Sequence, residues 1–177
     1  MSPLIGNSIA LRAMEPSDLE LLYQWENDPE VWIVSNTQIP YSKYLLKNFI
    51  DNAGQDIYSS KQLRLMIVEI TSGKTVGIID IFDFDPFHQR AGVGILIDKK
   101  SRNHGYASES ICLVKNYAFN VLLMHQLYCN ILEDNEISLK LFVNNGFSVS
   151  GRCNEWIKTK DGFKDAFFLQ CFNNLRK

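Results

Sequence analysis

Cysteine and histidine are scarce in this chain, and neither is grouped into a pattern. The 177 residues contain three histidines and four cysteines, Cys112, Cys129, Cys153 and Cys171. No Cys-x-x-Cys pair occurs, and no histidine stands at a spacing that would complete a zinc site, which argues against both a metal centre and a disulfide framework. We therefore predict no bound metal and expect the cysteines to be small core residues with reduced thiols.

Long apolar runs and clusters of basic residues are also absent. The first residues lack a basic start followed by a long apolar stretch, so neither a secretion signal nor a membrane span is predicted. Lys and Arg total 18 against 20 for Asp and Glu, and they form no basic patch of the kind that nucleic-acid binders use. We expect a cytoplasmic protein that contacts neither membrane nor nucleic acid.

What is present is enough apolar material for one core. Hydrophobic residues make up 46% of the 177 positions, which suits one domain, whereas the length is too short to suggest two. No internal repeat or low-complexity segment interrupts the chain. We predict a single domain over residues 1–177.

The first third of the chain predicts one strand and two helices. Ser17 and Glu20 have the spacing of a capping box, with Ser17 as N-cap of a helix. That helix is expected to end near Asn27, because Asp28 precedes a proline and is pushed out of the helical region. The other elements expected here are a strand over 7–12, a helix over 43–52 and a polar segment over 53–61.

The rest of the chain predicts hairpins first and crossover helices later. Ser72-Gly73 and Asp161-Gly162 indicate tight turns between β-rich segments. Strands are expected over 63–70, 76–84, 91–98, 126–131, 147–156 and 163–172, and helices from about 108 and over 138–145. This order predicts an α/β fold of the α+β kind, with a mixed central sheet of about seven strands and helices on both faces.

The segment Arg102-Asn103-His104-Gly105-Tyr106-Ala107 is the main functional signal. A glycine-containing turn that leads directly into a helix directs several backbone N–H groups to one place, and the helix dipole adds positive potential there. The same pattern alone is equally an ordinary strand-to-helix connection. The strand-like Ile95-Leu96-Ile97 before it and the helical spacing from Ile111 onward favour a site for a pyrophosphate.

Two other glycine patterns resemble nucleotide-binding motifs but lack a glycine that the motif requires. Ser72-Gly73-Lys74-Thr75 resembles the end of a phosphate-binding P-loop, but Val68 stands where that loop needs its first glycine. Gly92-Val93-Gly94 begins a dinucleotide-binding pattern, yet Ile97 stands at the third glycine, inside a strand. A hairpin turn and a strand are the better interpretations.

The chain resembles the GNAT N-acetyltransferases, whose coenzyme loop has the form Gln/Arg-x-x-Gly-x-Gly/Ala, at Arg102, Gly105 and Ala107. A second family motif, Asn-x-x-Ser before a helix that ends in Gly-Phe, is similar to the segment from Asn135 to Phe147. Residues 25–31 and 77–107 look most like the branch that contains ribosomal-protein N-terminal and polyamine (spermidine) acetyltransferases. The resemblance covers nearly the whole chain and implies a centrally splayed sheet.

The resemblance also implies acetyl-CoA as cosubstrate and assigns residues to it. Main-chain groups of Ile95, Leu96 and Ile97 would bind the pantetheine arm in the splay. The pyrophosphate would be held by the loop Arg102, Asn103, His104, Gly105, Tyr106, Ala107 and Ser108. Asn135 and Ser138 would lie beside the arm, and Phe142 near the thioester.

Two positions depart from the family pattern. Many members have a tyrosine at Phe142 that protonates the leaving thiolate, and relatives in this branch often have a glutamate at Gly92 that draws a proton from the amine. Asp80, among Ile78, Ile79 and Ile81, is the one candidate for a substitute base. Asp83 and Asp85 could attract a polycation, although a solvated edge is the simpler interpretation.

The missing base bears on the acceptor. A lysine-like amine costs roughly 4–5 kcal/mol to deprotonate at pH 7, whereas an N-terminal α-amine costs about 1 kcal/mol. We therefore predict direct attack by a peptide or protein N-terminal amine, with a small-molecule polyamine second, and catalysis that rests on orientation, worth about 7–11 kcal/mol. A non-catalytic acyl-CoA-binding or sensing module is the alternative, since both the acid and the base are absent.

An exposed sheet edge at 163–172 would permit a homodimer.

Overall fold

The computed structural model describes residues 3–35, 38–52, 54 and 56–173. The strands are β1 (Ile9–Arg12), β2 (Leu63–Glu69), β3 (Thr75–Asp85), β4 (Arg90–Ile97), β5 (Gln126–Leu132), β6 (Ser148–Thr159) and β7 (Gly162–Phe172). The α-helices are α1 (Leu19–Glu26), α2 (Pro29–Ser35), α3 (Lys43–Asp51), α4 (Ile57–Ser60), α5 (Tyr106–Asn120) and α6 (Glu136–Asn144), with short 3-10 turns η1 (Pro16–Asp18) and η2 (Lys99–Ser101).

All seven strands form one mixed sheet in the order β1-β2-β3-β4-β5-β7-β6. Neighbouring strands are antiparallel except β4 and β5, which are parallel and are joined through α5. The β4–β5 pairing covers only three residue pairs, the last being Gly92 with Tyr128. Beyond that pair the two strands separate, so the sheet is splayed at its centre, as predicted.

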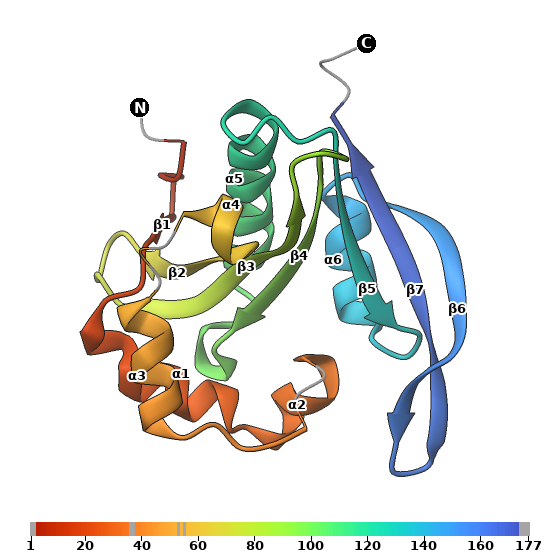
Figure 1. Cartoon of the computed structure of the whole chain (residues 1–177), viewed down its shortest axis with the longest axis horizontal. Helices are drawn as coiled ribbons and strands as arrows, with labels where there is room; N and C mark the ends of the chain where they lie inside the picture. Colours follow the sequence, from red (N-terminus) through yellow and green to blue (C-terminus); the bar gives the residue numbers. More distant parts are fainter. Residues whose placement is uncertain (1–2, 36–37, 53, 55, 174–177) are drawn as a thin grey trace.

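Two apolar cores cover opposite faces of the sheet, because side chains alternate along each strand. On one face Ile79 and Ile81 of β3 pack with Ile111 and other residues of α5. On the other face Ile78 packs with Leu22 of α1 and with residues of α3. Figure 1 shows α1, α2 and α3 beside β2–β4, while the hairpin of β6 and β7 extends on the other side of the view. The predicted arrangement with helices on both faces is confirmed.

The predicted start of the first helix was wrong. Glu15, and not Ser17, precedes the first turn: its N–H donates to the carboxylate of Asp18 at 2.8 Å, and η1 leads into α1 at Leu19.

Two helices were not predicted. Pro29 is expected from the sequence only to stop a helix, but it opens α2, and the N–H of Glu30 donates to Asp28 at 3.0 Å. The other, α4, lies in the segment predicted as polar and has only four residues.

Three further expectations need correction. β7 lies between β5 and β6, so 163–172 is an interior strand and β6 is the edge. The last turn consists of residues 160 and 161, because Gly162 already pairs with Thr159. Among the free cysteines, Cys129 and Cys171 are buried and Cys153 is half-buried, but Cys112 is exposed and is not a core residue. Burial raises the pKa of the Cys129 thiol to about 12.

Two absences concern only the residues that the structure describes. Among them, no helix has the length and apolar character needed to cross a membrane. Nor do their His, Cys, Asp and Glu side chains gather anywhere into a group of three or more that could hold a metal ion.

Candidate active site

The splay between β4 and β5 leaves one edge of β4 unpaired along its second half. On its other edge this part of β4 pairs with β3, Ile95 with Ile79, Leu96 with Ile78 and Ile97 with Gly77. Toward β5, none of these three residues has a pairing partner in the described sheet. On that side these residues have no strand partner, although the Ile97 carbonyl accepts a hydrogen bond from Arg102 Nε at 3.3 Å. This is where the sequence motifs predict the pantetheine arm.

The loop after β4 ends at the first turn of α5, and its backbone is shaped to bind an anion. Asn103 and Gly105 both have left-handed backbone conformations, with φ of 66° and 81°. Such alternation turns successive N–H groups toward one side. Gly105 is the N-cap of the 15-residue α5 and offers no side-chain cap to its first-turn amides. A Cβ added at Gly105 would meet nothing within 4 Å, so the space beside this residue is open.

Side chains around the loop mostly fix its shape. Arg102 Nε donates to the carbonyl of Ile97 at 3.3 Å, and the exposed ring of His104 stacks on Tyr106 at 5.4 Å. The Tyr106 hydroxyl in turn donates to Glu69. Ala107 is half-buried, and the Ser108 hydroxyl donates to Asn145 at 3.0 Å. Ser108 therefore has only its backbone N–H left for a ligand at the helix start.

The second motif caps a helix. Asn135 is the N-cap of α6, and its Oδ1 accepts the N–H of Ser138 at 3.1 Å. Phe142, one turn further, is only 4% exposed. Its ring meets the edge of Phe147 with the centroids 5.0 Å apart. The structure thus gives all three residues a local structural role, whatever they contribute to a coenzyme.

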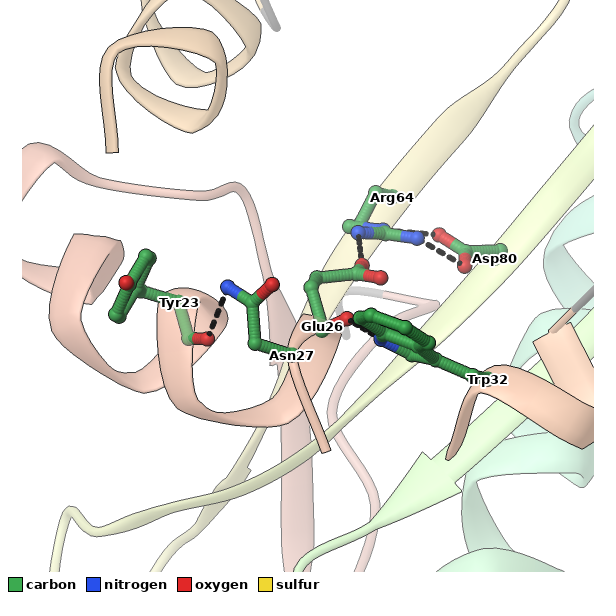
Figure 2. Close-up of polar contacts among 6 residues, drawn as sticks. All are labelled: Tyr23, Glu26, Asn27, Trp32, Arg64 and Asp80. Carbon is green, nitrogen blue, oxygen red and sulfur yellow. Dashed lines mark hydrogen bonds and ion pairs between the residues drawn. The ribbon is translucent and has the colours of Figure 1, made fainter. Parts of the chain in front are cut away.

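A buried charged cluster lies on the opposite face of the sheet, under α1 (Figure 2). Asp80 of β3 accepts two hydrogen bonds from Arg64 of β2, from Nε at 2.7 Å and from Nη2 at 2.8 Å. The remaining Nη1 of Arg64 donates to Glu26 at the end of α1. Burial lowers the pKa of Arg64, but Asp80 and Glu26 raise it by more, so the guanidinium stays charged. Two carboxylates share one cation, which leaves the cluster with one negative charge in excess.

The turn between α1 and α2 is built around this cluster. Trp32 of α2 donates its indole N–H to the main-chain carbonyl of Glu26 at 2.7 Å. Asn27 donates to the carbonyls of Tyr23 and Tyr41 at 2.9 and 3.0 Å, and Figure 2 shows the first of these contacts. Sequence reasoning missed Glu26 and Arg64. An arginine inside the apolar run of β2 was the available signal, because a buried cation needs a partner.

Comparison with known proteins decides the family. The family model described as "Acetyltransferase (GNAT) domain" matches residues 8–148. The chain belongs to the GNAT acetyltransferase family. Membership makes it an acetyl-CoA-dependent N-acetyltransferase, as the resemblance of its two motifs implied.

Relatives and solved structures of the GNAT family agree with this assignment. The spermidine N(1)-acetyltransferase of Escherichia coli K12 is 26% identical over 149 residues, covering 82% of this chain and 76% of that protein. An L-amino acid N-acetyltransferase of the same strain is 22% identical over 165 residues, covering 92% and 97%. The crystal structure of the Vibrio cholerae spermidine N-acetyltransferase in complex with CoA and spermine has the same fold, with a TM-score of 0.84, 20% identity and coverage of 94% and 96%.

In this GNAT member an aromatic ring takes the space above Gly92, the position where the family resemblance implied a glutamate. A Cβ added at Gly92 would lie 2.3–2.7 Å from three ring atoms of Phe82 on the adjacent β3 strand. Phe82 pairs directly with Gly92 across the two strands. The ring of Phe82 covers the main chain at this position, and any side chain at 92 would have to displace it.

Proposed function

We propose that this GNAT enzyme acetylates a small cationic amine, with a polyamine as the first candidate and a peptide N-terminus as the second. Acetyl-CoA would lie in the gap between β4 and β5, with its diphosphate on the first turn of α5. The observation that carries the coenzyme site is the open first turn of α5, which begins at Gly105 without a side-chain cap. The free, reduced cysteines fit a cytoplasmic location.

In the proposed site, each part of acetyl-CoA is bound by different residues around the splay. Main-chain groups of Ile95, Leu96 and Ile97 would hold the pantetheine arm, and the loop from Arg102 to Ser108 would hold the diphosphate. Uncapped amides at a helix start are orphan donors that suit a phosphate. Asn135, Ser138 and Phe142 would border the arm from α6. The coenzyme supplies an activated acetyl group, and the protein residues bind and orient it.

Catalysis would rest chiefly on orientation. Phe142 carries no proton to donate, but a thiol with a pKa near 8.5 leaves as a thiolate at a cost of only about 2 kcal/mol at pH 7. Asp80 remains our proposed proton acceptor. It already accepts two hydrogen bonds from Arg64, and taking a proton would break one of them. Holding amine and thioester in reacting geometry supplies about 7–11 kcal/mol without either group.

The charge of the ion cluster under α1 supports a cationic acceptor. The Glu26–Arg64–Asp80 cluster carries one excess negative charge, and its side chains are largely buried, at 8%, 13% and 17% exposed. The spermidine acetyltransferases among the relatives point the same way. In a polyamine, moreover, each further positive charge disfavours protonation of the reacting amine. The reacting amine of a polyamine therefore costs less free energy to deprotonate than an isolated lysine-like amine, which makes a polyamine the better acceptor of the two.

Replacing Gly105 tests the coenzyme site. Asparagine tolerates the left-handed conformation, so Gly105→Asn should fold normally while its side chain enters the space before the α5 amides. Gly73→Asn is the matched control, because Gly73 has φ of 69° and an added Cβ there also meets nothing within 4 Å. By calorimetry, we expect Gly105→Asn to weaken CoA binding at least about tenfold, or roughly 1.4 kcal/mol, and Gly73→Asn to leave it unchanged. Unchanged affinity in Gly105→Asn would refute the site.

An acceptor panel tests the rest of the proposal. Spermidine, n-butylamine and a tripeptide with a free N-terminus would be compared by titrating the CoA thiol released. We expect the highest kcat/KM for spermidine, at least about tenfold above n-butylamine. A preference for the tripeptide would move the assignment to N-terminal amines, and no release with any amine would leave a coenzyme-binding module.

A further inference from the structure

One face of β5 and β7 is open in the described chain. Leu127, Cys129 and Ile131 of β5 point into the core with α5, so Tyr128 between them points to the opposite face. In β7, Leu169 and Cys171 are in that core, which places Phe168 on the same face as Tyr128. The helices α1 and α3 cover this face only over β2–β4, where Met66, Ile78 and Leu96 meet them. Figure 1 accordingly shows α1 and α3 away from β5 and β7.

Three half-buried aromatic rings form a row across this face, one each from β3, β5 and β7. The centroids of Phe82 and Tyr128 are 6.1 Å apart with the rings nearly perpendicular. Those of Tyr128 and Phe168 are 5.5 Å apart with the planes tilted by 33°. Tyr128 pairs with Gly92 in the last pair before β4 and β5 separate. The aromatic row therefore crosses the sheet where the splay begins, over Gly92.

Asp83 adds a carboxylate to this row. It lies at an irregularity of β3, opposite the start of β4, and has a positive φ of 47°. For a residue other than glycine such a conformation costs roughly 1–3 kcal/mol, and bulges of this kind redirect side chains beside functional sites. The exposed carboxylate accepts a hydrogen bond from the Tyr128 hydroxyl at 3.2 Å. Among the described residues no salt bridge reaches Asp83: Arg90 pairs with Asp85 at 3.4 Å, and Lys61, which lines the same pocket as Asp83, is not within ion-pair distance of it.

Tyr128 itself is no proton acceptor for the reaction. Burial, together with the charge and hydrogen bond of Asp83, raises the pKa of Tyr128 to about 12. Asp85 raises it further and Arg90 opposes the shift. The phenol therefore stays neutral near pH 7. It donates a hydrogen bond to Asp83, which fixes the carboxylate beside the rings.

We propose that Asp83 and the rings of Phe82, Tyr128 and Phe168 bind a second positive charge of the acceptor, distinct from the amine that is acetylated. This inference rests on the proposed acetylation of a cationic amine. An ammonium group is attracted both by aromatic faces and by a carboxylate. A carboxylate also favours the protonated form of a bound amine, so the group held here is not the nucleophile. The preferred acceptors are then amines that carry two separated positive charges.

Direct binding tests this site without relying on turnover. Putrescine, with two amines, and n-butylamine, with one, would be titrated by calorimetry into the CoA-loaded protein. Asp83→Asn removes the charge while keeping a residue that tolerates the positive φ. Glu155→Gln is the matched control, because Glu155 is an exposed acid with φ of 49° at an irregularity of β6. We expect Asp83→Asn to weaken putrescine binding about tenfold, or roughly 1.4 kcal/mol, Glu155→Gln to change the binding of neither amine, and neither variant to change CoA binding.

Ring variants separate the aromatic part of the site from the charge. Phe168→Leu should weaken putrescine binding about three- to fivefold through loss of one cation–π face worth about 0.5–1 kcal/mol, whereas Tyr128→Phe keeps its ring and should change it less. No loss of putrescine binding in Asp83→Asn, or a wild-type protein that does not distinguish the two amines, would each overturn the inference. Failure of acetyl transfer with retained, Asp83-dependent putrescine binding would instead count against the enzymatic function alone.

Discussion

At the scale of single residues, the pair of Gly92 and Phe82 shows how this chain departs from its relatives. The family resemblance implies a glutamate at 92, and the sequence gives no reason for the glycine found there. The reason is a contact across two strands: the Phe82 ring lies where any side chain at 92 would begin. An aromatic ring that covers a cross-strand glycine shields the exposed backbone. Such a contact depends on the register of β3 against β4, which no local pattern in the sequence fixes.

We predict energetic coupling between these two residues. Gly92→Ala should destabilise the fold by about 1–3 kcal/mol, because its Cβ overpacks against the ring. In Phe82→Ala/Gly92→Ala the overlap is gone, so the double variant should cost at least about 1 kcal/mol less than the sum of the single changes. Urea denaturation of the four proteins measures this. Gly94→Ala is the control, since its Cβ would lie at 3.6 Å from the same ring and should show no coupling. Additive costs for 82 and 92 would contradict the contact.

At the scale of secondary-structure elements, most segments were predictable because their signals are local. The β2–β3 hairpin, β4 and α5 follow from apolar periodicity and turn residues that act within a few positions. The missed α2 shows the limit of such signals. A proline ends one helix and equally suits the first turn of the next, and at Pro29 it does both, with Asp28 accepting the Glu30 N–H. Sequence spacing cannot separate these two roles.

The start of α1 makes a prediction about pH. Asp18 is 3% exposed, and burial raises its pKa, but hydrogen bonds from Arg12 at 2.6 and 2.8 Å and from the Glu15 N–H lower it by more, so the net shift is downward. A carboxylate with a lowered folded-state pKa contributes stability above its unfolded value near 3.9, and this contribution is lost as the pH falls through the folded value.

Asp18→Asn should therefore cost about 2 kcal/mol at pH 7, and the difference from the wild type should shrink below about pH 4. Urea unfolding at pH 7 and pH 3 provides the comparison. Asp51→Asn, which removes an exposed pair with Lys47, should cost no more than about 0.5 kcal/mol at either pH. A cost for Asp18→Asn that does not depend on pH would show that its charge is not what stabilises the helix start.

At the scale of the whole molecule, the turn at Gly105 that opens α5 was predictable, and the ion cluster under α1 was not. The loop at Gly105 is contiguous in sequence, so its motif is recognisable from the order of residues alone. The Glu26–Arg64–Asp80 cluster joins residues from α1, β2 and β3 that are far apart in the chain. Its formation depends on α1 packing over the sheet. In the sequence Asp80 therefore stands out as an isolated acid, although in the fold it is one part of a three-residue ion cluster.

This cluster ties α1 to the sheet, and removing its cation should be costly. Arg64→Met leaves Glu26 and Asp80 buried without their shared partner, which should destabilise the fold by about 3–5 kcal/mol at pH 7. Arg152→Met removes an arginine that also bridges two acids, Glu133 and Asp165, but its side chain is 52% exposed, so the cost should stay below about 1 kcal/mol.

The same pair of variants, followed by urea denaturation against pH, separates charge from packing. Two unpaired buried carboxylates have raised pKa values, so protonating them stabilises the folded state, and the deficit of Arg64→Met should become smaller as the pH is lowered toward 4. The deficit of Arg152→Met should stay small throughout. If Arg64→Met were within about 1 kcal/mol of the wild type at pH 7, the methionine would replace the ion cluster without loss. That result would contradict the prediction that Arg64 is needed to hold the carboxylates of Glu26 and Asp80 in the folded protein.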